Sequence, residues 1–224
     1  MIHDVSTDTR PLRADAERNR KRLLDAAVEV FAEHGLEAST AEIARRAGVG
    51  QGTVFRRFPT KDDLVAAIVV DRLGQITDAA SALLAHPPAD GRVLAFMADL
   101  ARIHVRDRGL IEAVSGTGAL ADPAVHDAHG ALMDVLEELV KADQDAGLIR
   151  QDLGAFDVMA LGKAVASACE PGLTGASWKR YLAVVAVGLR PTADKLPGRA
   201  PTRAQLDRLF TELAGPEKTQ GPLE

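Results

Sequence analysis

The chain has 224 residues with a net charge of −5, and its 46% hydrophobic and 26% charged content is typical of a globular protein that can bury a core. Its apolar runs fall short of the ~20 residues that a membrane span requires, and the N-terminus lacks the apolar core of a signal peptide, so we expect no membrane partner. The single cysteine, Cys169, excludes an intramolecular disulfide and favours the cytoplasm.

The first segment, residues 1–14, is polar and aperiodic, and we expect a flexible arm. A helix is predicted over Asp15–His34, and Gly35 supplies its stop. The apolar residues of this helix recur at spacings of three and four, which indicates one buried face: Leu24, Ala27, Val28 and Phe31.

Two short helical patterns follow within residues 39–61. Ser39 and Glu42 form a capping box, in which each side chain satisfies a free backbone N–H near the helix start. The first helix ends at Gly48, which is suited to a left-handed C-cap. Its apolar face is predicted to contain Ile43, Ala44 and Ala47.

The second short helix has one apolar edge, formed by Val54 and Phe58 at i and i+4. Gly52, Thr53 and Arg56 point away from that edge, with Arg57 beside them. A helix supported from behind, with small, hydroxyl and guanidinium groups in front, fits a DNA major groove. The pair is therefore predicted to be a helix-turn-helix.

A long helix is predicted next, capped by Thr60 and ending before His86-Pro87-Pro88. Asp62 and Asp63 fall in its first turn, where the helix dipole favours carboxylates. Its length makes it a candidate strut between a head and a body.

Beyond Gly91 every regular pattern is helical, and no strand or repeat is evident. The expected segments are about 92–107, a short one near 110–114, one to about 145 capped by Asp122, one from Asp152 to Cys169, one over 178–189, and a last one opened by a Thr202–Gln205 capping box. The predicted fold is all-α with about nine or ten helices. Its predicted divisions are an arm (1–14), a three-helix helix-turn-helix domain (15–62), a larger helical bundle (63–214, with 63–85 as connecting helix) and a flexible tail (215–224).

Charge is distributed unevenly along the chain. Arg10 to Lys61 contains 11 Lys and Arg against 7 Asp and Glu, a balance of +4, whereas the chain from Leu64 onward contains 16 against 21, a balance of −5. Phosphate contacts need local positive charge rather than a basic whole chain. The asymmetry supports a DNA-binding head on an acidic body.

The stretch from about Arg20 to Leu64 resembles the DNA-binding domain of TetR-type bacterial transcriptional regulators. The resemblance is carried by Leu24-Asp25-Ala26-Ala27, Phe31-x-x-x-Gly35, Ile43-Ala44-x-x-Ala47-Gly48-Val49, Gly52-Thr53-Val54-Phe55-x-x-Phe58 and Lys61-x-x-Leu64. It covers about a fifth of the chain. Two residues depart from the family pattern: Gly50 replaces a usual capping Ser, and Phe55 replaces a Tyr that often contacts a phosphate.

Base contacts are expected from Arg56, which can pair with guanine O6 and N7, and from Gln51, which can pair with adenine N6 and N7. Gly52 would let the backbone lie close to the duplex. Lys61 resembles the family's phosphate-binding lysine at a helix start. The remaining expected DNA-contacting residues are Thr40, Arg45, Gly50, Thr53, Phe55 and Arg57.

The resemblance also implies a ligand-responsive homodimer on a near-palindromic DNA operator, most often a repressor. The dimer is expected to form through helices at about 154–169 and 177–189, whose small and branched residues permit close approach, although the same residues would also suit a monomer core. An effector pocket is expected inside the body, and each candidate residue is equally suited to the core: Phe96, Met97, Leu100, His104, Met133 and Trp178, with Leu110 and Leu136 of the same type.

Two rival functions are a non-specific architectural DNA binder and a metal sensor or enzyme built on the helical body. His126 and His129 share a helix face, but no cysteine is near, so we predict no metal site and no cofactor. No Ser/His/Asp or Cys/His grouping has an informative spacing, and Cys169 is expected to be a buried small hydrophobe. We therefore expect a regulator rather than an enzyme.

Overall fold

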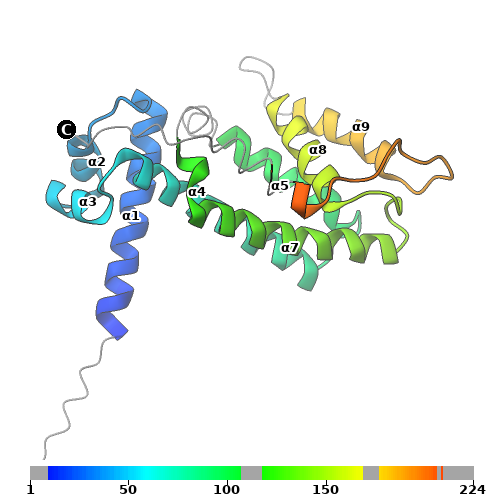
Figure 1. Cartoon of the computed structure of the whole chain (residues 1–224), viewed down its shortest axis with the longest axis horizontal. Coiled ribbons are helices and arrows are strands. Elements are labelled where there is room, and N and C mark those ends of the chain that lie inside the picture. Colours follow the sequence, from blue (N-terminus) through cyan, green and yellow to red (C-terminus); the bar gives the residue numbers. More distant parts are fainter. Residues whose placement is uncertain (1–9, 107–117, 169–176, 206–207, 209–224) are drawn as a thin grey trace, which may run out of the picture.

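The computed structural model describes residues 10–106, 118–168, 177–205 and 208. Within these ranges every regular element is a helix: α1 (Arg10–His34), α2 (Thr40–Ala47), α3 (Gln51–Arg57), α4 (Lys61–Ala85), α5 (Arg92–Arg106), the 3-10 helix η1 (Gly118–Ala121), α7 (Pro123–Asp145), α8 (Ala155–Ser167) and α9 (Ser177–Leu189). Figure 1 shows α1, α2 and α3 as a head at one end and α5, α7, α8 and α9 as a body at the other. The predicted all-α fold is confirmed.

The first helix begins earlier than the sequence pattern indicated. α1 starts at Arg10 rather than Asp15, so its first turns extend into the segment that was expected to be a flexible arm. Pro11 fits the first turn of a helix because the N–H that proline lacks has no intrahelical partner there. The predicted end is confirmed: Gly35 has a φ of 68°, and its N–H donates to Phe31 O at 2.9 Å.

The long α4 begins as predicted. The Thr60 hydroxyl accepts from Asp63 N, and the Asp63 carboxylate accepts from Thr60 N, which completes a capping box. Leu73, midway along α4, packs against both hydrophobic cores of the molecule, that of the head and that of the body. α4 also lies against α7 in Figure 1, so these two helices connect head and body.

The head core does not stop at α3. Leu64, Val65 and Ile68 of α4 are buried in it, together with Val125 of α7. The start of α7 is as predicted, with the Asp122 carboxylate accepting from Ala124 N at 2.7 Å and Pro123 in the first turn. Because α7 begins in the head core and ends in the body, movement of either part acts on the same rigid helix.

A buried carboxylate joins α7 to the start of α5 in the body. Asp143 of α7 is 0% exposed, and its Oδ2 accepts from Val93 N at 2.8 Å near the start of α5. Its Oδ1 accepts from Arg92 Nη1 at 3.1 Å. Gly91 adopts a φ of 93°, and a Cβ there would lie 2.9 Å from Asp143 Oδ2, so only glycine permits this approach.

One predicted helix cap is wrong. α8 starts after Gly154, whose N–H donates to the Asp157 carboxylate at 2.9 Å, and Asp152 does not cap it. Asp152 instead accepts from Arg150 Nε at 2.6 Å and from Leu196 N at 2.7 Å. The hydrogen bond from Arg150 holds the pKa of Asp152 well below its ordinary range. Asp152 therefore ties the turn before α8 to the segment after α9.

The remaining predictions for the body have mixed outcomes. α5 and α9 match the expected segments closely. The last capping box is half formed: the Gln205 side chain accepts from Thr202 N at 2.8 Å, whereas the Thr202 hydroxyl donates to Gln205 Oε1 at 3.1 Å instead of accepting from Gln205 N. The short helix predicted near 110–114, Cys169, most of the last helix and the tail lie outside the described residues. None of the helices in the described ranges combines the length and apolar character that crossing a membrane requires.

Candidate nucleic-acid interface

The helix-turn-helix is formed by α2 and α3. The Ser39 hydroxyl accepts from Glu42 N at 3.2 Å, and Gly48 adopts a φ of 68° at the predicted stop of α2. The predicted capping box is only half formed, because the Glu42 carboxylate accepts from Arg45 Nε at 3.1 Å instead of turning back to Ser39. The predicted apolar face of α2 is buried: Ile43, Ala44 and Ala47.

α3 is a short helix braced from behind. Val54 is 0% exposed and Phe58 is 6% exposed, so the predicted apolar edge lies in the head core. Phe55 is half-buried. The other predicted contact residues of α3 are exposed on the opposite side of the helix: Gln51, Gly52, Thr53, Arg56 and Arg57. The geometry therefore matches the arrangement predicted from the sequence, a rigid helix with polar groups in front.

Two arginines of α3 have defined partners. Arg56 Nη2 donates to Thr53 Oγ1 at 3.3 Å, which orients the guanidinium along the exposed face and leaves most of its donors available. Arg57 Nη1 donates to Ala16 O of α1 at 3.3 Å. A Cβ built at Gly52 would meet no atom within 4 Å, so the backbone there is open to a ligand.

Among the other predicted contact residues, Gly50 is the exposed N-cap of α3 and provides no side-chain cap. Lys61 Nζ donates to Leu36 O, so part of its hydrogen-bonding capacity is used within the head. Arg45 remains accessible, with 71% of its side chain exposed.

Thr40 requires a correction. It is 2% exposed, and its hydroxyl has no hydrogen-bond partner among the described residues, so its side chain does not lie on the surface as predicted. It occupies the first position of α2, directly after the Ser39 cap, and faces inward with the helix's apolar residues. The hydroxyl that was expected to contact a phosphate is therefore buried in this structure.

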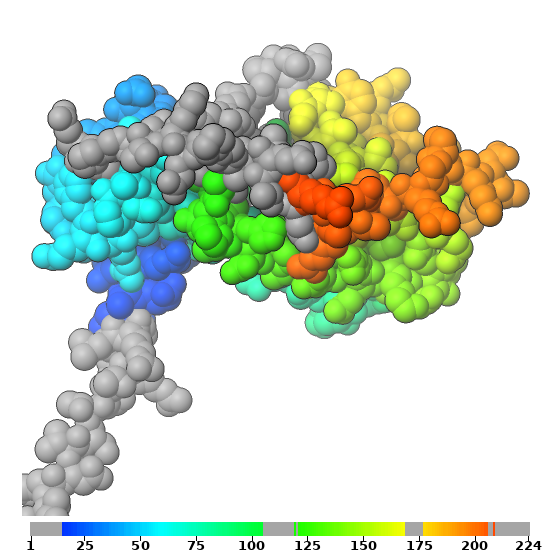
Figure 2. All heavy atoms as spheres, in the orientation of Figure 1, coloured from blue at the N-terminus to red at the C-terminus, as the bar shows by residue number. Residues whose placement is uncertain are grey.

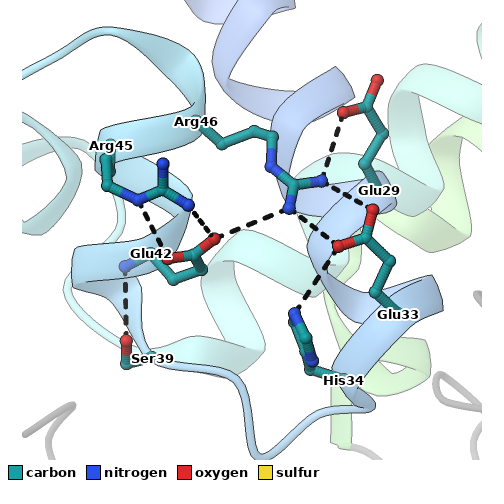
Figure 3. Close-up of polar contacts among 7 residues, drawn as sticks. All are labelled: Glu29, Glu33, His34, Ser39, Glu42, Arg45 and Arg46. Carbon is teal, nitrogen blue, oxygen red and sulfur yellow. Dashed lines mark hydrogen bonds and ion pairs between the residues drawn. The ribbon is translucent and has the colours of Figure 1, made fainter.

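Sequence reasoning missed Arg46, which joins α2 to α1 (Figure 3). Arg46 Nη1 and Nη2 donate to the two carboxylate oxygens of Glu33 at 2.8 and 2.7 Å, and Glu29 and Glu42 lie 3.6 and 3.5 Å away. The hydrogen bond from Arg46 lowers the pKa of Glu33, and the same contact raises the pKa of Arg46. The spacing of Glu29 and Glu33 at i and i+4 was the available signal, but it did not identify a partner on another helix.

The predicted effector residues do not gather in one cavity of the described structure. Phe96, Met97 and Met133 are buried in the body core, while Leu100 and His104 are half-buried on α5. A groove of about 650 Å³ lies between α5 and α9, and Trp178 is the one predicted residue that lines it. Arg102 and Lys179 lie 5.9 and 5.7 Å from the Trp178 ring centre. Met133 lines a separate cavity of about 390 Å³ between α7 and residues 201–203.

The predicted dimer helices carry exposed apolar stripes. Val184 and Val187 of α9 are 68% and 61% exposed, with Tyr181 on the same side. α8 exposes Ala160 and Ala164, whereas other members of the predicted set are buried or half-buried in the body: Val165, Ala166 and Val185. The residues of these helices that were expected at a dimer interface thus divide into an exposed set and a buried set.

Among the described residues, no three His, Cys, Asp or Glu side chains gather in a way that could hold a metal ion. His126 and His129 lie on α7, and His104 lies on α5.

Residues 23–68 match the family model described as bacterial regulatory proteins of the tetR family, and residues 87–191 match that of the SbtR-like transcriptional regulator C-terminal domain. The crystal structure of a TetR transcription regulatory protein from Mycobacterium vanbaalenii is 40% identical, with a TM-score of 0.63, and the match covers 80% of this chain and 99% of that one. A TetR transcriptional regulator from Streptomyces coelicolor is 33% identical, with a TM-score of 0.62 and coverage of 78% and 99%.

An HTH-type transcriptional repressor of Mycobacterium tuberculosis is 42% identical over 105 residues, which are 42% of this chain and 54% of that protein. The chain thus spans about half the length of the curated relatives it matches. The chain is also similar to the crystal structure of the regulator FadR from Bacillus subtilis in complex with stearoyl-CoA, with a TM-score of 0.58. The match covers 76% of this chain and 99% of the FadR chain. At 19% identity, this likeness shows the fold alone.

Proposed function

The chain belongs to the TetR family of bacterial transcriptional regulators, and from this premise we propose that it is a dimeric repressor that a small-molecule effector releases from a near-palindromic operator. The observation that carries this proposal is the exposed face of α3. Gln51, Thr53 and Arg56 stand in front of a helix that Val54 and Phe58 hold in the core. A helix presented in this way fits the major groove of duplex DNA.

We assign base recognition to Arg56 and Gln51, since guanidinium and amide groups can each make two hydrogen bonds to a purine edge. The open backbone at Gly52 allows close approach of the duplex. Phosphate contacts are assigned to Arg45, Arg57 and Lys61, with Gly50, Thr53 and Phe55 at the same surface. These contacts position the head, and the base contacts supply the sequence preference.

One such helix reads a short segment, so we propose a twofold dimer that places two of them about 34–36 Å apart, one turn of DNA. The exposed stripes of α8 and α9 supply its interface. Val184, Val187 and Tyr181 support this assignment because neighbouring exposed apolar side chains are typical of protein–protein contact surfaces. Light scattering at micromolar protein should give twice the mass of one chain, and a monomer at that concentration would contradict the proposal.

The effector is proposed to act by shifting the dimer between two head spacings. α4 and α7 connect the head core to the body core, so a ligand that prefers one body arrangement also prefers one spacing. Trp178 is the single tryptophan of the chain and lines the α5–α9 groove. Candidate ligands can therefore be titrated by Trp178 fluorescence and by operator affinity. If ligands that bind all leave operator affinity unchanged, the switching mechanism is wrong.

Operator selection tests the main proposal against its rivals. Wild-type protein is used to enrich duplexes from a random pool at fixed salt. A regulator enriches a palindromic sequence with half-sites one turn apart, whereas an architectural binder enriches none. Metal analysis of purified protein separately tests the metal-sensor alternative. The protein is proposed to act in the bacterial cytoplasm, where the operator lies, and no catalytic role is proposed.

A further inference from the structure

The N-terminal half of α1 extends beyond the head without a core of its own. The buried residues of α1 begin at Leu23, and all described side chains from Asp15 to Arg22 are exposed except Arg20, which is half-buried. Figure 1 shows this half continuing past α3, and in Figure 2 its coloured part is the dark-blue region below the cyan segment. We call Arg10–Arg22 the α1 overhang.

The α1 overhang is strongly basic. It contains six Lys and Arg against two Asp and Glu, a balance of +4, although the whole chain has a net charge of −5. The described side chains of the overhang are exposed or half-buried, so they gain little from burial, and a short helix is marginal in water by itself. A concentration of positive charge on a helix that protrudes from the fold is suited to an anionic partner.

The position of the α1 overhang specifies that partner. Arg57, at the end of α3, donates to Ala16 O at 3.3 Å, so the overhang lies against the C-terminal end of α3. Arg20 lines the same surface hollow as Arg57 and Phe58. With a rise of about 1.5 Å per residue, the first turns of α1 reach about 9 Å beyond Ala16. A duplex held by α3 would thus continue along the overhang.

The basic side chains of the overhang are held only weakly. Arg18 pairs with Asp15 and Arg22 with Asn19, each three residues away on the same helix, and Lys21 Nζ lies 3.9 Å from Asp25. Exposed pairs of this kind contribute little to stability, so phosphates can compete for the cations. A duplex offers one phosphate charge per about 1.7 Å of its axis, a density that several neighbouring cations can match.

We infer that the α1 overhang is a second DNA-contacting element, which lies along the phosphates flanking the segment read by α3 and lengthens the footprint of each head. This inference rests on the proposed function and adds a surface to it. The overhang contributes affinity and salt dependence, whereas sequence preference belongs to α3.

The test compares wild-type protein with a variant carrying Arg18→Gln, Lys21→Gln and Arg22→Gln. A matched control neutralises three exposed cations of the body, with Lys141→Gln, Lys195→Gln and Arg199→Gln. Each protein is titrated with the selected operator in two forms, trimmed to its half-sites or extended by flanking duplex, over a range of salt concentrations. Circular dichroism and the melting temperature show whether the variants remain folded.

Wild-type and control proteins should bind the extended duplex about tenfold or more tightly than the trimmed one, because the extension adds phosphate contacts. The overhang variant should lose that difference, lower the salt slope by about 0.9 for each lost contact, and keep the same preferred sequence. If a folded variant retains the wild-type affinity difference and slope, or if wild-type protein shows no difference, the inference is wrong. If wild-type protein selects no sequence at all, the proposed function itself fails.

Discussion

The guanidinium of Arg46 donates to both carboxylate oxygens of Glu33, at 2.8 and 2.7 Å, and thereby joins α2 to α1. Figure 3 shows that Glu29 and Glu42 approach the same guanidinium from α1 and from α2. A two-pronged pair of this type fixes direction as well as distance. Since α3 is positioned through α2, this pair helps to set the angle at which α3 is presented.

Replacing Arg46 by alanine should therefore loosen the head. We expect Arg46→Ala to lower the melting temperature by a few degrees and to weaken operator binding severalfold without changing the preferred sequence. Thermal unfolding and operator titration provide the measurements. Arg45→Ala is the matched control for stability, because Arg45 is paired with Glu42 within its own helix and is largely exposed. Equal melting temperatures for the two variants would contradict the structural role of Arg46.

The same pair predicts a pH dependence. The hydrogen bond from Arg46 lowers the pKa of Glu33 in the folded protein below its ordinary value of 4.5. The unfolded chain therefore takes up the proton first, and the contribution of Glu33 to stability is complete above about pH 4.5 and lost as the pH falls through the lower folded value. Melting temperatures measured from pH 6 downward should fall less steeply for Glu33→Gln than for wild type. Glu37→Gln, at a nearby exposed position, should follow the wild-type curve.

Asp143→Ala should destabilise the body. The substitution removes the acceptor for Val93 N and the partner of Arg92, and Asp143 is fully buried. A buried donor left without its acceptor costs about 1–3 kcal/mol, so chemical denaturation should show a loss of at least this order. Asp145→Ala on the exposed end of α7 is the control. Surface substitutions usually change the free energy of unfolding by no more than about 0.5 kcal/mol. A change within about that range for Asp143→Ala would show that the body does not need this contact.

The dimer proposal predicts that charge on the α9 stripe separates the chains. Val184→Glu combined with Val187→Glu should shift the mass measured by light scattering from two chains to one at micromolar protein, because like charges would face each other across a twofold axis. Operator affinity should fall with dimer loss. Leu196→Glu changes another exposed apolar residue outside the stripe and should leave the dimer intact. A stable dimer in the double variant would place the interface elsewhere.

Local signals determined the parts of the fold that were predicted well. The Ser39 and Thr60 caps, the left-handed Gly48 and the Val54–Phe58 edge depend on residues within one turn of each other, and the structure has all of them. Asp152 failed as a predicted cap because its partners, Arg150 and Leu196, compete for it from outside the helix. Asp152 has the sequence signature of a cap, and only tertiary structure reveals the competition.

In the candidate site, too, the features that depend on local sequence were predicted, and those that depend on packing between helices were not. The exposed face of α3 follows from helical periodicity and was predicted residue by residue. The burial of Thr40 was not predicted, because the side on which the first residue of a helix falls depends on how α2 packs against α1. The Arg46 cluster was missed for the same reason: its acidic partners are mostly on another helix, and sequence spacing alone does not pair them.

The most direct test of the central claim is the affinity of wild-type and Arg56→Ala proteins for the selected operator and for a duplex scrambled at the half-sites, at one salt concentration. We predict that Arg56→Ala loses about 1–3 kcal/mol of discrimination per base contact and retains wild-type affinity for the scrambled duplex within a factor of a few. Arg57→Ala, which removes the phosphate contact proposed for Arg57, should weaken both duplexes alike. Undiminished discrimination by a folded Arg56→Ala protein would contradict the role assigned to the exposed face of α3.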